Sequence, residues 1–124
     1  MNLLLWILQG LLALAFGVFG FTHAFRIEQA RTRPRMAWMN AVPRGMWTFI
    51  GLAEILGALG LILPAVTGIW PWLTPLAALG LSVIMLLAAG FHSTRREYEV
   101  IVPNLVLLVL AAVVAYGRFV IVPL

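Results

Sequence analysis

Four long apolar segments constrain what this chain can fold into. They cover residues 2–22, 46–64, 72–91 and 103–121. Each is close to the ~20 residues that a helix needs to cross about 30 Å of hydrocarbon. Lipid offers no hydrogen bonds to a backbone, so helices are expected, and the segments lack the short alternating pattern of a β-barrel. The sequence therefore predicts an all-α fold of four transmembrane helices.

The composition agrees with a membrane environment. Hydrophobic residues make up 64% of the 124 residues, and charged residues only 10%, against about 25% in an ordinary soluble domain. A small soluble domain cannot bury so much apolar surface. The length predicts one domain, residues 1–124. The first segment has no basic residue ahead of it and is long, so we expect a span rather than a cleaved signal peptide.

The arginines predict how the helices are oriented. The link 65–71 is short, so its flanking helices should be antiparallel, and the bundle should run up-down-up-down. Residues 23–45 and 92–102 then share one side, and they carry seven of the eight arginines: Arg26, Arg31, Arg33, Arg35, Arg44, Arg95 and Arg96. Positive loops remain in the cytoplasm. We expect both termini outside a bacterial cytoplasmic membrane.

The net charge of +4 is assigned to a face beside anionic lipid and not to nucleic acid, because no soluble fold is available to present a basic groove. The long connection 23–45 places apolar residues, among them Met36 and Trp38, between arginines. Two arrangements are open for it. It lies on the membrane surface as an amphipathic segment, or it caps the bundle.

One acidic residue, Glu54, stands within the second span. A charged residue at a helix centre costs about 2.5–3.5 kcal/mol on the insertion scale. Nine Phe, Ile or Leu residues in the same span offset this by roughly 0.5 kcal/mol each. Residues at helical spacing from Glu54 include Gly51, Gly57 and Ala58. Small faces pack against other helices, with Gly51, Gly57 and Gly60 as packing residues, so Glu54 should face the bundle interior.

Two states are open to a carboxylate in that position. Desolvation favours the protonated acid, whereas a nearby cation or several donors favour the ionised form. An intramembrane ionisable group points to a functional site. The simpler alternative is a neutral carboxylic acid that donates one hydrogen bond between helices.

The candidate partners of Glu54 are His23, His92, Asn104 and Arg44, which all fall in the same half of the bundle. Helical rise places Glu54 about 15 Å beyond Arg44, and His92 only roughly 4.5 Å from Arg95. Glu54 should therefore lie deeper than the histidines, and the sequence does not imply direct contact. A proton path from His92 to Glu54 is one interpretation. The spacing does not support a metal site.

Three stretches resemble the DoxX-like family of small four-helix membrane proteins. They are GLAEILGALGLILP (51–64), LTPLAALGLSVIMLLAAGFH (73–92) and PNLVLLVLAAVVAYGRF (103–119). The likeness covers most of residues 43 to 119. It implies that the family's motif glutamate is Glu54, its histidine at the end of the third span is His92, and its late arginine is Arg118.

The resemblance also implies function. The family takes its name from subunits associated with a thiosulfate:quinone oxidoreductase, and distant animal relatives assist the assembly of receptor channels. The chain has no cysteine, which argues against thiol chemistry of its own. We expect a membrane protein that binds a lipophilic ligand such as a quinone, or a membrane subunit of an oxidoreductase complex, with Glu54 and His92 as the polar site.

The alternative function is a non-enzymatic assembly or scaffolding protein that packs on itself, as a homo-oligomer, or on another membrane protein. A transporter is a third class, and it would need a dimer because four short spans leave little room.

Overall fold

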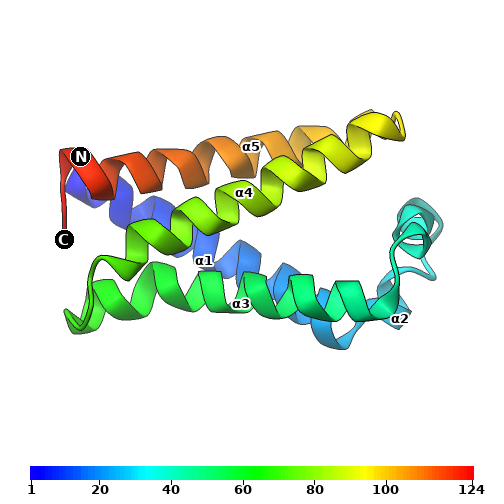
Figure 1. Ribbon diagram of the computed structural model, residues 1–124, viewed down its shortest axis with the longest axis horizontal. Coiled ribbons are helices and arrows are strands. Elements are labelled where there is room, and N and C mark those ends of the chain that lie inside the picture. The colour runs from blue at the N-terminus through cyan, green and yellow to red at the C-terminus, as the bar shows by residue number, and fades with distance from the viewer.

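Helices account for nearly the whole chain in the computed structural model (Figure 1). The structure describes the backbone of residues 1–124 and every side chain except that of Arg35. The long helices are α1 (Asn2–Phe25), α3 (Arg44–Thr67), α4 (Leu73–Thr94) and α5 (Tyr98–Tyr116). A π-helical turn, η2 (Gly117–Ile121), continues α5. All four segments are long and apolar enough to cross a membrane, so the predicted all-α membrane fold is confirmed.

The helices extend beyond the predicted spans. We expected the second span to stop at Pro64 and the fourth to open at Pro103. Instead, both prolines lie inside helices. The last residue of α3 is Thr67, and Gly68, which follows it, has a left-handed φ of 72°. Proline is tolerated in transmembrane helices where other groups satisfy the backbone that it frees.

Pro64 shows how that backbone is satisfied. Proline has no N–H, so it cannot bond the carbonyl four residues earlier, which is that of Gly60. The Thr74 hydroxyl of α4 donates to Gly60 O at 2.9 Å. A hydrogen bond between helices therefore replaces the one that Pro64 cannot make, and it ties α3 to the start of α4.

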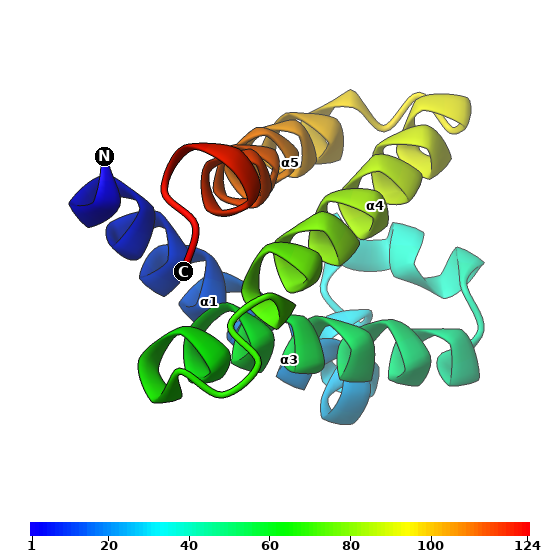
Figure 2. The same ribbon diagram turned by 60° about the vertical axis from the view of Figure 1, so that its left-hand side comes forward.

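The bundle consists of two closely packed pairs, α1 with α3 and α4 with α5, which α3 and α4 join. Figure 2 shows α4 between α3 and α5. Both termini and the α3–α4 connection (68–72) lie at one end, here called the amino-terminal end (Figure 1). Residues 26–43 and 95–97 lie at the other, the arginine-rich end.

A central core holds residues from all four long helices. Its buried members are Leu12, Phe16, Ala58, Leu61, Ala78, Leu81, Met85, Ala111, Val114 and Ala115. Only 22–33% of each spanning segment is buried inside the chain. The remaining apolar surface requires lipid or another membrane protein around it.

The α1–α3 connection consists of α2 (Ile27–Ala30) and the 3₁₀-helix η1 (Pro34–Ala41). Ile27 and Met39 form a second apolar cluster with Trp47, near the start of α3. The Trp47 indole donates to Met39 O at 2.9 Å. Of the two predicted arrangements, this packing favours the one in which the connection caps the bundle.

Candidate functional site

The buried carboxylate of Glu54 pairs with His23. Nδ1 of His23 lies 2.7 Å from Oε1 of Glu54, and Glu54 is only 1% exposed. Glu54 thus faces the bundle interior. The expectation that the carboxylate lies deeper than the imidazoles is wrong for His23.

Helix packing explains this contact. A Cβ placed on Gly51 would lie 2.5 Å from Gly20 O, so the two backbones touch there. α1 and α3 run in opposite directions (Figure 1). Helical side chains lean toward their own amino terminus. His23 and Glu54 therefore lean toward each other and meet at a common depth.

Aromatic rings extend from the His23–Glu54 pair across the arginine-rich end. The ring centroids of His23 and Trp47 are 4.6 Å apart, and those of Trp47 and Trp38 are 5.9 Å apart. Trp38 in turn meets His92 edge-on, at 4.4 Å. These four rings connect α1, α3, η1 and α4 into one cluster, which we call the ring cluster.

His92 is buried, but it does not reach Glu54. Its Nδ1 lies 3.1 Å from Oε1 of Glu97, which also accepts a hydrogen bond from Nε of Arg95 at 3.0 Å. Glu97 follows α4 directly in the sequence, so this pairing is local. The structure therefore has two separate histidine–carboxylate pairs. Their imidazoles are the two end members of the ring cluster, and Trp47 and Trp38 lie between them.

Two further predicted residues have different surroundings. Arg44 begins α3, and its side chain is 69% exposed, 3.8 Å from Oε1 of Glu28. It is a surface charge and does not contact Glu54. Asn104 lies in the first turns of α5, and its Nδ2 is buried with no acceptor among the described residues. The indole nitrogen of Trp38 is buried in the same unpaired state.

The three glycines predicted to pack lie at contacts between helices. Gly51 touches α1, as described above. A Cβ on Gly57 would lie 2.6 Å from Leu81, and one on Gly60 would lie 2.7 Å from Ala77. The small faces at Gly57 and Gly60 are therefore occupied by α4 of the same chain.

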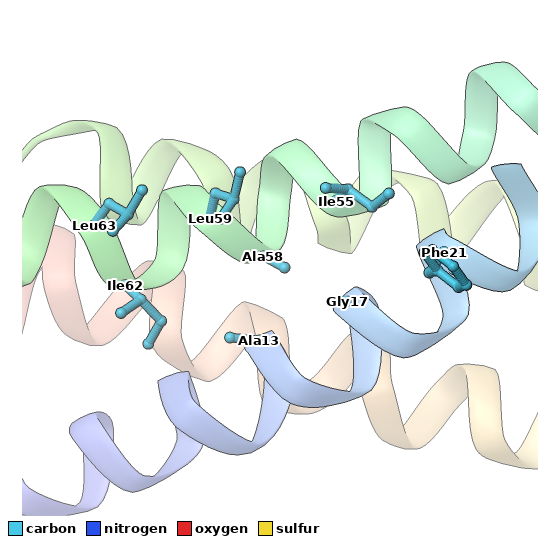
Figure 3. A pocket seen from close by; sticks show the side chains of 8 residues that line it. All are labelled: Ala13, Gly17, Phe21, Ile55, Ala58, Leu59, Ile62 and Leu63. Carbon is cyan, nitrogen blue, oxygen red and sulfur yellow. The ribbon is translucent and has the colours of Figure 1, made fainter. Parts of the chain in front are cut away.

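An apolar groove of about 400 Å³ runs along the outside of the α1–α3 contact (Figure 3). Its lining residues are Ala13, Gly17, Phe21, Ile55, Ala58, Leu59, Ile62 and Leu63. Phe21 and His23 are two residues apart and thus roughly 200° apart around the helix. The groove consequently lies on the other side of α1 from the His23–Glu54 pair, and Glu54 does not line it.

A second polar cluster, at the amino-terminal end, was not predicted as a site. Nε of Arg118 donates to Oε1 of Gln9 at 2.7 Å, and Nη1 donates to Oδ1 of Asn2 at 2.8 Å. Sequence reasoning reached Arg118 only through the family resemblance. The signal available for Gln9 was an amide side chain in the interior of an apolar span.

The comparisons with known proteins concern the family alone. Residues 7–114 match the model of the DoxX-like family. No curated protein and no solved structure matched the chain. The matched region includes α3 and α4 completely and most of α1 and α5. The chain therefore belongs to the DoxX-like family of membrane proteins.

Proposed function

We propose that this membrane protein binds a lipophilic ligand whose head carries acceptor oxygens, with a quinone as the leading candidate, at the arginine-rich end. The observation that carries the proposal is the buried Glu54–His23 pair. A carboxylate at 1% exposure in a membrane helix is expensive, and such groups generally mark sites that handle ligands or protons. The hydrogen bond to His23 joins this carboxylate to an imidazole, a group that can accept or donate a proton.

The pair can exchange a hydrogen bond or a proton with a ligand oxygen. A carboxylate on Nδ1 fixes the tautomer and the orientation of an imidazole, leaving the other nitrogen free to act. Among the described side chains, none bonds Nε2 of His23. This nitrogen can accept a hydrogen bond from a hydroquinone hydroxyl. When the ring is protonated, it can donate one to a quinone carbonyl.

Unpaired donors in the arginine-rich half of the bundle support a ligand with acceptor oxygens. Trp38 Nε1 and Asn104 Nδ2 are both buried without an acceptor among the described residues. Buried donors are seldom left unpaired in proteins, because each one forfeits its hydrogen bond to water. The aromatic faces of the ring cluster, Trp38 and Trp47 among them, suit a flat conjugated head. Together these features fit a quinone ring better than an aliphatic lipid.

The proposal also covers the orientation of the protein and the membrane in which it lies. The arginine-rich end faces the cytoplasm and both termini face outward, because six of the eight arginines fall in the two connections at that end and a seventh, Arg44, begins α3 there. The membrane is a bacterial cytoplasmic membrane. The chain has no cysteine, so we assign it the role of a quinone-binding subunit beside a separate oxidoreductase chain.

Tryptophan fluorescence provides the test, because a quinone bound near Trp38 and Trp47 should quench their emission. The purified full chain is titrated in detergent with decylubiquinone, alongside Glu54→Gln and His23→Gln. Both variants should bind roughly tenfold more weakly, which corresponds to about 1.4 kcal/mol. Glu99→Gln is the matched control, since Glu99 is exposed and should leave affinity unchanged. Wild-type affinity in folded Glu54→Gln would overturn the proposal.

A further inference from the structure

The amino-terminal end holds a buried cation that has no buried anion beside it. Arg118 is only 2% exposed. Its described hydrogen-bond partners are Gln9 Oε1, Asn2 Oδ1 and the Val122 carbonyl, all of which are neutral. The Trp6 ring, 5.4 Å from Cζ, adds a cation–π contact. These groups solvate the guanidinium without neutralising its charge.

The partners are held in place by the rest of the bundle. The Gln9 amide donates through Nε2 to Leu61 O at 2.7 Å, which leaves its Oε1 to accept from Arg118. A Cβ on Gly117 would lie 2.7 Å from Leu5, so α1 and the π-helical turn η2 touch beside the arginine. The site is thus built on three elements, α1, α3 and η2.

No side-chain carboxylate of the chain reaches this site, and no ion pair joins Arg118 to any other group among the described residues. The four acidic residues are Glu28, Glu54, Glu97 and Glu99; Glu54 pairs with His23, and the other three lie in connections or helix starts at the arginine-rich end. Moreover, Nη2 of Arg118 is buried with no hydrogen-bond partner among the described residues. A buried guanidinium without a counter-ion is strongly unfavourable in an apolar environment. The site therefore lacks an anion.

We propose that Arg118 binds the phosphate of an anionic membrane lipid, with Nη2 as the free donor. A guanidinium forms charge-assisted hydrogen bonds with phosphate oxygens, and its planar fork suits them. One phosphate would satisfy Nη2 and neutralise the charge together. This inference is independent of the quinone proposal, which concerns the opposite end of the bundle.

Position favours a lipid phosphate over a free one. Arg118 lies three residues before Ile121, the last residue of the spanning segment, or about 4.5 Å of helical rise. Asn2, which bonds the same guanidinium, is exposed and begins α1. Residues 122–124 follow η2 without helical structure, and the Val122 carbonyl accepts from Nη1 of Arg118. The guanidinium is consequently at headgroup depth.

Native mass spectrometry of the full chain in detergent tests the assignment with three probes: phosphatidylglycerol, phosphatidylcholine and inorganic phosphate. The wild type should retain phosphatidylglycerol in preference to the other two. Arg118→Gln should bind it roughly tenfold more weakly. Arg33→Gln is the control for the loss of one positive charge, because Arg33 is exposed at the arginine-rich end; it should weaken the retention of phosphatidylglycerol far less than Arg118→Gln does.

Asn2→Asp keeps the test decisive if Arg118→Gln does not fold. It is nearly isosteric and places a carboxylate on Nη1 of Arg118, which Asn2 Oδ1 now contacts at 2.8 Å. With this internal counter-ion, retention of phosphatidylglycerol should fall while the bundle remains folded. Equal retention by the wild type and Asn2→Asp would overturn the phosphate assignment. A preference of the wild type for inorganic phosphate would overturn the lipid as its source.

Discussion

His23 and Glu54 are 31 residues apart in the sequence, yet Nδ1 of one lies 2.7 Å from Oε1 of the other. The pair joins α1 to α3, the two helices that share the most extensive contact with each other. The close backbone contact at Gly20 and Gly51 sets how these two helices lie against each other. The buried carboxylate therefore has a fixed partner, and its contribution to stability can be separated experimentally into packing and hydrogen bonding.

Replacement of Glu54 distinguishes these two roles. Glu54→Gln keeps the volume and one acceptor oxygen, so the free energy of unfolding should fall by only about 0.6–1.7 kcal/mol, the range of hydrogen bonds between membrane helices. Glu54→Ala also leaves a cavity and an unpaired His23 Nδ1, and should cost about 2–5 kcal/mol. Unfolding in mixed detergent measures both, with Glu99→Gln as the exposed control. Equal losses with Gln and Ala would mean that neither the volume nor the amide oxygen of Gln replaces what the carboxylate provides to His23.

Gly51 should be intolerant of any side chain. Its Cβ would meet the Ala24 amide and lie 2.5 Å from Gly20 O, both of which are backbone atoms that cannot rotate away. Gly51→Ala should destabilise the fold by about 1–3 kcal/mol through overpacking and should separate His23 from Glu54. In Gly80→Ala, the new methyl meets nothing within 4 Å, so alanine's higher helix propensity should leave stability equal or slightly raised. Similar losses at both positions would contradict this account.

The sequence predicted the four spans well because hydrophobic length alone determines them. The burial of Glu54 also followed from local information, namely the small residues on its face of the helix. The sequence named His23 only as one of four candidate partners of Glu54, and it did not predict a partner for Arg118. His23, and not His92, reaches Glu54, and Gln9 meets Arg118 across 109 residues, because the relative depth of two helices depends on how their surfaces pack.

The ends of the helices were also predicted incorrectly from the sequence. The sequence predicts helix boundaries at Pro64 and Pro103, since proline breaks most helices in water. Within this bundle, the Thr74 hydroxyl satisfies the carbonyl that Pro64 leaves free, so the helix continues past it. A donor that comes from another helix is not visible in the local sequence.

Trp47 should hold the α1–α3 connection against the bundle. Its indole is buried and donates to Met39 O at 2.9 Å, and its ring contacts Trp38. Trp47→Phe removes this donor and leaves Met39 O with only the Val42 N–H, 3.2 Å away. The connection should then open more often, and trypsin should cleave after Arg31 several-fold faster, given about 1 kcal/mol for the lost hydrogen bond. Trp70→Phe is the control, because Trp70 is 67% exposed. An unchanged cleavage rate would mean that apolar packing alone holds the connection.

Thr74 and Pro64 should show coupled effects on stability. Thr74→Val removes the donor to Gly60 O and should lower the free energy of unfolding by about 1 kcal/mol. Pro64→Ala restores a backbone N–H at the position that normally bonds Gly60 O, so Thr74→Val made in that background should have little effect.

The four free energies of this double-mutant cycle can be measured by unfolding in mixed detergent. Ser82→Ala is the matched control, because Ser82 donates to Ala78 O within its own helix, where Ser82 N–H already serves that carbonyl. Its effect should be the same with proline or alanine at position 64. Strict additivity of Thr74→Val and Pro64→Ala would show that Thr74 stabilises the α3–α4 contact by packing and not through the carbonyl that proline leaves free.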